Sequence, residues 1–182
     1  MSRGNVLFLV TGSIAAYKAC TVVSRLGQAG VDVQVVATPS ALKFVGETTW
    51  EGLSGRPVFS DLWASGRAMD HISLARKAQL AVVCPATAAS LNRLSAGLAD
   101  DALGTLFLAW ELATKPWWVI PAMNASMWTH PATQSSVATL RSWGVKVVEP
   151  DAGAHACGED GPGRFPDPER IAQDILAALP PA

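Results

Sequence analysis

The chain has 182 residues, a formal net charge of -1 and only 16% charged residues. This balance provides no basic surface for nucleic acid or for an anionic membrane, so we exclude both as partners. The length predicts one domain over residues 1–182. Seven tryptophans and 49% hydrophobic residues give more apolar surface than a small monomer readily buries, which favours an oligomer or a deep ligand cleft.

The cysteines and the apolar runs indicate a cytoplasmic protein. Cys20, Cys84 and Cys157 are odd in number and show neither metal-ligand nor redox spacing, and no cluster of histidines and carboxylates predicts a metal. The N-terminal run Val6 to Val10 is too short for a secretory signal, and no other run is long enough to cross a membrane. We therefore expect reduced thiols and no metal.

Apolar runs alternate with helical patterns along the chain, which is typical of a parallel sheet covered by helices on both faces. The predicted strands lie near residues 5–11, 32–37, 80–84, 117–120 and 145–148. The predicted helices lie near residues 13–29, 40–46, 71–78, 88–95, 100–113, 126–143 and 167–179. Residues 151–166 are rich in glycine and proline and form the one long irregular segment, where we expect a substrate lid.

Two strand ends carry small and hydroxyl-bearing residues. The first predicted strand runs through Thr11-Gly12-Ser13-Ile14 directly into a helix, whose N-terminal amides can face an anion. The second ends in Thr38-Pro39-Ser40. This is not the three-glycine dinucleotide fingerprint, so a plain tight turn with Ser13 as N-cap stays open beside the phosphate-binding interpretation.

The eight residues Pro121 to Trp128 read PAMNASMW and follow an apolar run, Trp117 to Ile120, that predicts a buried strand. Ligands bind at the carboxyl ends of strands in open α/β sheets, so Asn124 is placed to hold the edge of a substrate or cofactor. The alternative is a strand-to-helix turn with Asn124 as N-cap and the methionines in the core.

This string resembles the Pro-x-Met-Asn-x-x-Met-Trp signature of the flavin-containing cysteine decarboxylases, which act on phosphopantothenoylcysteine or on the C-terminal cysteine of lantibiotic-type peptides. Further landmarks of the family follow the same order as here: TGSIAAYKA, HISLAR, PATAAS, AGLADD and ACGEDGPGR. The resemblance implies a flavodoxin-like or Rossmann-like α/β flavoprotein fold with a three-layer parallel sheet. It also implies FMN as cofactor, with FAD as the alternative, and a homotrimer or a multiple of trimers.

The resemblance also implies which residues hold the flavin. The string PATAAS resembles a family loop that contacts flavin and substrate, but Ala89 stands where the family usually has asparagine, so the amide hydrogen bonds of that residue are missing. A plain helix start is the alternative for this loop. The implied cofactor-binding residues are Gly12, Ser13, Ile14, Thr38, Ser40, Thr87, Ser90 and Ala122.

His71 is the candidate for proton chemistry, because histidine exchanges protons near neutral pH. It opens the string that matches the family's active-site histidine, and Arg76 matches a position that is basic in several phosphopantothenoylcysteine decarboxylases. We expect Arg76 and Met127 to contact the substrate, and Asn124 to bind its carboxylate. Without the resemblance, His71 is more simply an exposed or capping residue and Arg76 part of a solvated helix face.

Cys157 lies in the predicted lid and matches the cysteine that, in phosphopantothenoylcysteine decarboxylases, protonates an enethiol intermediate. Peptide decarboxylases of the family commonly lack it, so its presence favours the phosphorylated substrate. Its neighbour Ala156 is a further expected substrate contact. However, His155 replaces the usual leucine and Ala154 offers no charge to a phosphate, and both changes leave room for a peptide.

The expected reaction is therefore the FMN-dependent oxidative decarboxylation of a cysteine carboxylate to an enethiolate. Removal of hydride from the carbon that bears sulfur creates the electron sink that decarboxylation needs. Phosphopantothenoylcysteine and a C-terminal peptidyl cysteine both remain candidate substrates. A flavin-binding regulatory protein without enzymatic activity and a flavin prenyltransferase are the alternatives of other classes.

Overall fold

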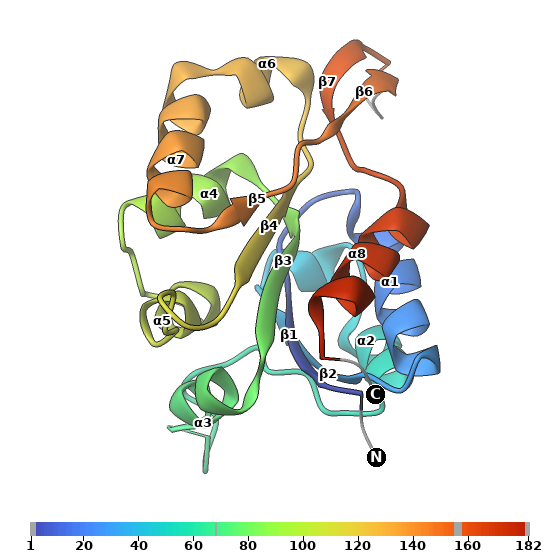
Figure 1. The fold of residues 1–182 in the computed structure, drawn as a ribbon, viewed down its shortest axis with the longest axis vertical. Coiled ribbons are helices and arrows are strands. Elements are labelled where there is room, and N and C mark those ends of the chain that lie inside the picture. The colour runs from blue at the N-terminus through green and yellow to red at the C-terminus, as the bar shows by residue number, and fades with distance from the viewer. Residues whose placement is uncertain (1–2, 68, 155–157, 181–182) are drawn as a thin grey trace.

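The computed structural model describes residues 3–67, 69–154 and 158–180. In this part of the chain, five parallel strands form the central sheet: β1 (Asn5–Val10), β2 (Asp32–Ala37), β3 (Leu80–Ala86), β4 (Trp117–Pro121) and β5 (Lys146–Val147). Their spatial order is β2-β1-β3-β4-β5 (Figure 1). This is the order of flavodoxin-like folds, in which ligands bind beyond the carboxyl ends of the strands near β1 and β3. The predicted α/β class is confirmed.

Helices cover both faces of the sheet and make two separate cores. Val6 and Phe8 of β1 pack into one core, whereas Leu7 and Leu9 pack into the other, because successive side chains of a strand point to opposite faces. The first core is covered by α1 (Ala16–Gln28), α2 (Glu47–Ser54) and α8 (Pro168–Ala178). The second is covered by α3 (Asp70–Lys77), α4 (Ala88–Ser95), α5 (Ala102–Leu108) and α7 (Pro131–Ser142).

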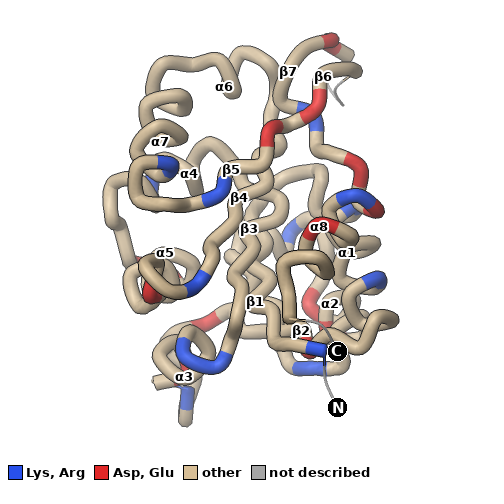
Figure 2. Tube along the Cα trace, in the orientation of Figure 1, with Lys and Arg blue, Asp and Glu red and all other residues tan. Residues whose placement is uncertain are grey.

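The centre of the sheet carries no charge. The strands β1, β3 and β4 contain no Asp, Glu, Lys or Arg, and Figure 2 shows the charged residues on the surrounding helices, loops and outer strands. Every residue of β3 and β4 is buried. Strands covered on both faces are near-continuous apolar runs, which is why the sequence predicted them. Among the described residues, no helix is long and apolar enough to span a bilayer.

The helix predicted over residues 126–143 is wrong as a single element. It consists of α6 (Ala125–Thr129) and α7, which are separated by His130 in an extended conformation. The residue before a proline is disfavoured in helical geometry, so Pro131 ends one helix and starts the next. The imidazole Nδ1 of His130 accepts the N–H of Ala132 and caps the second helix.

Three other predicted elements differ from the structure. The helix expected near 40–46 is a short 3-10 turn, Ala41–Lys43, and α2 follows it where no helix was predicted. The helix expected over 100–113 ends earlier, at Leu108. Residues 151–166 are not simply irregular, because β6 (Asp151–Ala154) and β7 (Asp160–Arg164) pair as an antiparallel ribbon. Glycine and proline in this segment hid the ribbon from a pattern-based prediction.

Gly104 of α5 is closely packed, and a substitution at this position tests that packing. A Cβ at this position would lie 2.0 Å from the Leu98 carbonyl oxygen, whereas a Cβ at Gly52 of α2 would meet nothing within 4 Å. We expect Gly104→Ala to lower the free energy of unfolding by about 1–3 kcal/mol through overpacking. The control Gly52→Ala should raise it by about 0.5–1 kcal/mol, since alanine is the better helix former. Urea denaturation measures both, and an unchanged midpoint for Gly104→Ala contradicts the packing.

Candidate functional site

A cavity of about 480 Å³ opens at the carboxyl end of the sheet. Its walls come from three segments: Ser13 to Lys18 at the start of α1, Ala122 to Asn124 after β4, and the ribbon with Ala154 and Gly163 to Phe165. Figure 1 shows the ribbon of β6 and β7 beside α6, above the start of α1. The cavity therefore lies where a flavodoxin-like fold binds its ligand.

The strand ends at the cavity are tied together by Thr11. Its side chain is buried, its hydroxyl donates to the Pro85 carbonyl at 2.7 Å, and it accepts the N–H of Thr87 at 3.1 Å. The next residue, Gly12, packs so closely that a Cβ there would lie 2.6 Å from the Cβ of Ser40. Gly12 thus lets the loops after β1 and β2 touch, and the two predicted phosphate-binding segments lie side by side.

Ser13 and Ile14 line the cavity, as does Ala122. The N-cap position of α1 belongs to Ala15, so Ser13 is not the N-cap, although its Oγ accepts the Ala15 N–H at 3.2 Å. The hydroxyl of Thr38 accepts the N–H of Ala41 at the 3-10 turn. The predicted flavin contacts of these residues stay predictions.

The hydroxyls of Thr87 and Ser90 take part in the N-terminal cap of α4. Thr87 is the N-cap of α4, where its Oγ1 accepts the Ser90 N–H at 3.2 Å and lies 2.9 Å from the Ser90 Oγ. Neither residue lines the cavity, and Ser90 is buried. The capping interpretation of PATAAS therefore describes the side-chain contacts present in this structure.

Asn124 combines both interpretations made from the sequence. It is the N-cap of α6, and its Oδ1 accepts the N–H of Met127 at 2.9 Å. It also lines the cavity, and its amide nitrogen has no hydrogen-bond partner among the described residues. The cap fixes the side chain while its N–H groups remain available to a ligand. The methionines do not both fill the core, since Met127 is 48% exposed.

The ribbon is fixed against the loop that carries Asn124. The N–H of Met123 donates to the Gly163 carbonyl at 3.0 Å, and a Cβ at Gly163 would lie 2.5 Å from the Met123 carbonyl oxygen. Gly163 also has a φ of +111°, which disfavours other residues. The close approach of this backbone to that of Met123 therefore requires glycine at position 163. Ala156 and Cys157, both predicted at the site, lie outside the described residues.

The structure separates His71 from this cavity. His71 lies in the first turn of α3, which precedes β3 and stands at the amino end of the sheet, opposite α6 (Figure 1). Its Nδ1 is buried and has no hydrogen-bond partner within residues 3–67, 69–154 and 158–180. Arg76 is exposed at the other end of the same helix. One chain therefore brings neither His71 nor Arg76 to Asn124.

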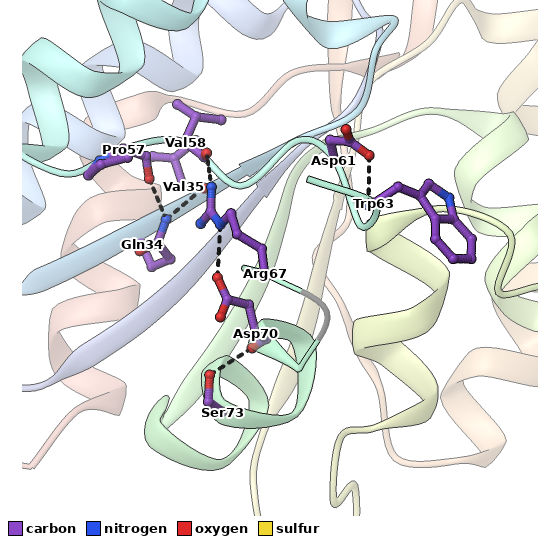
Figure 3. A network of polar contacts seen from close by, with 9 residues as sticks. All are labelled: Gln34, Val35, Pro57, Val58, Asp61, Trp63, Arg67, Asp70 and Ser73. Carbon is purple, nitrogen blue, oxygen red and sulfur yellow. Dashed lines mark hydrogen bonds and ion pairs between the residues drawn. The ribbon is translucent and has the colours of Figure 1, made fainter. Parts of the chain in front are cut away.

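Arg67 holds the start of α3 against the edge of the sheet (Figure 3). Its Nε pairs with the Asp70 carboxylate at 2.8 Å, and its Nη1 donates to the Val58 carbonyl at 3.0 Å. The guanidinium also lies 4.8 Å from the ring centre of Phe59, whose backbone bonds to β2. Because Asp70 immediately precedes His71, this network fixes the position of the histidine.

The described cysteines are not part of the site. Burial raises the pKa of the Cys84 thiol well above its ordinary value and also raises that of Cys20, so both stay protonated at neutral pH. Both are free thiols. The described residues contain no group of three or more His, Cys, Asp or Glu side chains that could bind a metal.

Eight of the cavity residues were not among the predicted site residues, and they include the aromatic and charged ones: Tyr17, Lys18, Arg164 and Phe165. The signal for the first two was present, because residues three and four positions after Ile14 share its face of a helix. The signal for the last two was absent, since the ribbon itself was not predicted.

A parallel sheet of this order with a cavity at its carboxyl end is typical of nucleotide-binding and flavin-binding α/β proteins. The sequence matches the Flavoprotein family over residues 1–179, and the chain belongs to that family. Together with the relatives described next, this match confirms the resemblance to flavin-containing cysteine decarboxylases that the motifs indicated.

Known relatives fall into the same group. The chain is 46% identical over 170 residues to the coenzyme A biosynthesis bifunctional protein CoaBC of Mycolicibacterium smegmatis, covering 93% of this chain and 40% of that protein. It thus spans less than half of the curated relative. It is similar to a PPC decarboxylase mutant complexed with pantothenoylaminoethenethiol, with a TM-score of 0.85 and 30% identity over 96% of this chain and 97% of the other. For the FMN-dependent cysteine decarboxylase SpaF the TM-score is 0.79, with 31% identity over 97% and 98% of the chains.

The Arg67 network predicts an effect on stability. We expect Arg67→Met to lower the free energy of unfolding by about 1–2 kcal/mol, because it leaves the Asp70 carboxylate and the Val58 carbonyl without their donor. The control Arg25→Met removes an exposed ion pair with Glu169 and should change stability by less than about 0.5 kcal/mol. If urea denaturation gives the same loss of unfolding free energy for Arg67→Met and Arg25→Met, the Arg67 network does not stabilise the fold as predicted.

Proposed function

We propose that this chain binds FMN and oxidatively decarboxylates the carboxylate of a cysteine-bearing substrate. The observation that carries the proposal is Asn124, whose oxygen is committed to the α6 cap while its N–H groups stay available in the cavity. A side chain held in this way is preorganised to donate to a carboxylate. The PPC decarboxylase and SpaF similarities support the same reaction class.

The residues at the strand ends fit a flavin phosphate. Close contact of Gly12 with Ser40 leaves backbone N–H groups and hydroxyls together at the start of α1, where an anion is favoured. We propose that Gly12, Ser13 and Ile14 hold the phosphate of FMN with Thr38 and Ser40. When bound, FMN supplies the acceptor for the hydride that leaves the carbon bearing sulfur.

The protein side chains handle the carboxylate and the protons. Asn124 donates to the substrate carboxylate and fixes its orientation, and His71 accepts the proton of the substrate thiol. Loss of carbon dioxide then leaves an enethiolate on the substrate. For phosphopantothenoylcysteine, Cys157 is the proposed donor of the proton that completes reduction to the thiol. A peptide substrate would leave as the enethiol, and the flavin would be reoxidised by another acceptor.

His71 acts in this proposal from a second copy of the chain, because within one chain it lies at the opposite end of the sheet. Large apolar side chains are exposed both near α3 and at the cavity. Met69 (68%) is the N-cap of α3 and Trp63 (89%) lies in the loop before that helix, while Ile14 (58%) and Tyr17 (60%) lie at the cavity. Contact between two different patches is heterologous and forms a ring where the rotation between chains closes, as in the homotrimer that the family resemblance implies.

The proposed location is the cytoplasm, which suits the free thiols of Cys20 and Cys84. Both phosphopantothenoylcysteine and a C-terminal peptidyl cysteine carry the required thiol and carboxylate. The similarity to coenzyme A biosynthesis proteins supports the former, and that to SpaF supports decarboxylation of a cysteine more generally.

An anaerobic assay with phosphopantothenoylcysteine and with a peptide ending in cysteine tests the function. We expect one substrate to lose carbon dioxide, and mass spectrometry with flavin absorbance follows the reaction. Loss of carbon dioxide without net flavin reduction identifies the complete coenzyme A pathway reaction. Loss of carbon dioxide and two hydrogens with flavin bleaching identifies a peptide enzyme. If neither substrate changes while flavin stays bound, the proposal is wrong and a regulatory flavoprotein is favoured.

The variant Asn124→Asp tests the role of the Asn124 amide in the same assay. Aspartate keeps an oxygen that can accept the Met127 N–H, so the α6 cap and the melting temperature should be retained. It replaces the N–H donor with a negative charge, and we expect turnover to fall by about 100- to 1,000-fold. Full activity of this variant contradicts the proposed role of Asn124.

Mixed oligomers test whether a site uses two chains. His71→Asn and Asn124→Asp should each be inactive alone, since each lacks one group. After co-refolding, about a quarter of the sites in a random cyclic oligomer combine both wild-type groups, so about a quarter of the activity should return. Refolding each variant alone is the control. No recovery, with mixed oligomers confirmed by mass, contradicts the shared site.

A further inference from the structure

The helix α3, which carries His71, has little apolar surface to hold it in place. Of its eight described residues only Ala75 is buried, and Leu74 is partly buried against the second core. A helix shorter than about 12 residues is at best marginally stable on its own in water, so its position depends on contacts with the rest of the chain. The position of His71 therefore depends on the groups that hold the two ends of α3.

The C-terminal end of α3 is held by Lys115, which lies in the turn between α5 and β4. Its Nζ donates to the carbonyls of Ala75 and Arg76, at 2.8 Å each. The last carbonyls of a helix have no N–H partner within it and carry partial negative charge, so a cation is the favoured donor there. Together with the Arg67 network at the first turn (Figure 3), this contact places a cation at each end of α3.

Lys115 is itself held by Trp110. The indole Nε1 of Trp110 donates to the Lys115 carbonyl at 3.0 Å, and the Lys115 ammonium lies 5.0 Å from the centre of the Trp110 ring. Trp110 is buried and packs edge-on against Trp117 of β4. Lys115 therefore connects α3 to the central sheet through a buried aromatic side chain.

We propose that Lys115 is a positioning residue for His71, which the proposed function places in the site of a neighbouring chain. This assignment rests on that function, in which His71 accepts the proton of the substrate thiol. His71 lies four residues before Ala75, about 6 Å along a helix axis, so a shift of the C-terminal end also moves the imidazole. A displacement of about 1 Å at a reacting group costs up to about 100-fold in rate. Lys115 does not line the cavity, and it acts through α3.

The first test is Lys115→Met in the FMN-loaded protein, with the substrate that the wild type decarboxylates. Methionine keeps an apolar stem over Trp110 but removes the charge and the N–H donors. We expect kcat to fall by about 10-fold while KM stays within about 2-fold, because Asn124 and the cavity are unchanged. Lys115→Arg keeps a charged N–H donor and should recover most of the rate. An equal loss of kcat in both variants, or no loss in either, overturns the proposal.

Lys146→Met is the matched control. Lys146 of β5 also stacks on a tryptophan, with its Nζ 3.5 Å from the ring centre of Trp118, but β5 packs against β4 and α7, whereas α3 packs against α5 and β1. This variant should keep kcat within about 2-fold of the wild type. A loss equal to that of Lys115→Met shows a general effect of losing a lysine–tryptophan contact and overturns the proposal. If Lys115→Met does not fold, Lys115→Gln replaces it in each test, since glutamine keeps an N–H donor without the charge.

Mixed oligomers separate a positioning role from a general loss of stability. In a ring that combines His71→Asn and Asn124→Asp chains, each complete site takes α3 from the Asn124→Asp chain and the cavity from the His71→Asn chain. Adding Lys115→Met to the Asn124→Asp chain should lower the recovered activity by about 10-fold. Adding it to the His71→Asn chain should leave that activity nearly unchanged. Equal losses in the two mixtures overturn the proposal.

Hydrogen exchange tests the contact between Lys115 and α3 without turnover. We expect the backbone amides of α3 to exchange about 10-fold faster in Lys115→Met than in the wild type or in Lys146→Met, since local opening of the helix is easier. If the wild type decarboxylates neither substrate, the proposed function fails, but exchange in α3 still decides whether Lys115 holds the helix. Unchanged exchange overturns the proposal, as does faster exchange with full activity.

Discussion

The N–H of Met123 donates to the carbonyl of Gly163, and this main-chain contact joins the two segments on which the cavity depends. No side chain fits at Gly163, because a Cβ would lie 2.5 Å from the Met123 carbonyl oxygen. The loop on one side of the contact carries Asn124, and the ribbon on the other side carries Arg164. An amide and a cation face one space because two backbones can approach this closely.

Asn124 illustrates how a capping residue can also serve a site. Its Oδ1 satisfies an N–H at the start of α6, which stabilises the helix and fixes the side chain. The amide N–H groups are then oriented before any ligand arrives, so their reorganisation costs little. Thr87 and Ser90 do not have this double role, because their hydroxyls bond to each other in the cap of α4.

The sequence predicted those features that depend on local pattern. The central strands are continuous apolar runs, and PAMNASMW begins at the last residue of β4, so the location of Asn124 could be predicted. The ribbon could not, because Gly161 and Gly163 lie within its strand β7 and permit close contact with Ala125 and Met123 rather than a turn. The separation of His71 from Asn124 was equally hidden, since a motif does not reveal at which end of the sheet a helix lies. Pro131 was a visible signal that the prediction of one long helix overlooked.

In the proposed mechanism, α3 of one chain meets the cavity of another, because His71 and Asn124 lie at opposite ends of the sheet within one chain (Figure 1). Native mass spectrometry of the flavin-loaded protein tests this requirement most directly. We predict a ring of three chains, or a multiple of it, with one FMN for each chain. A monomer that retains FMN and decarboxylates its substrate would contradict the account.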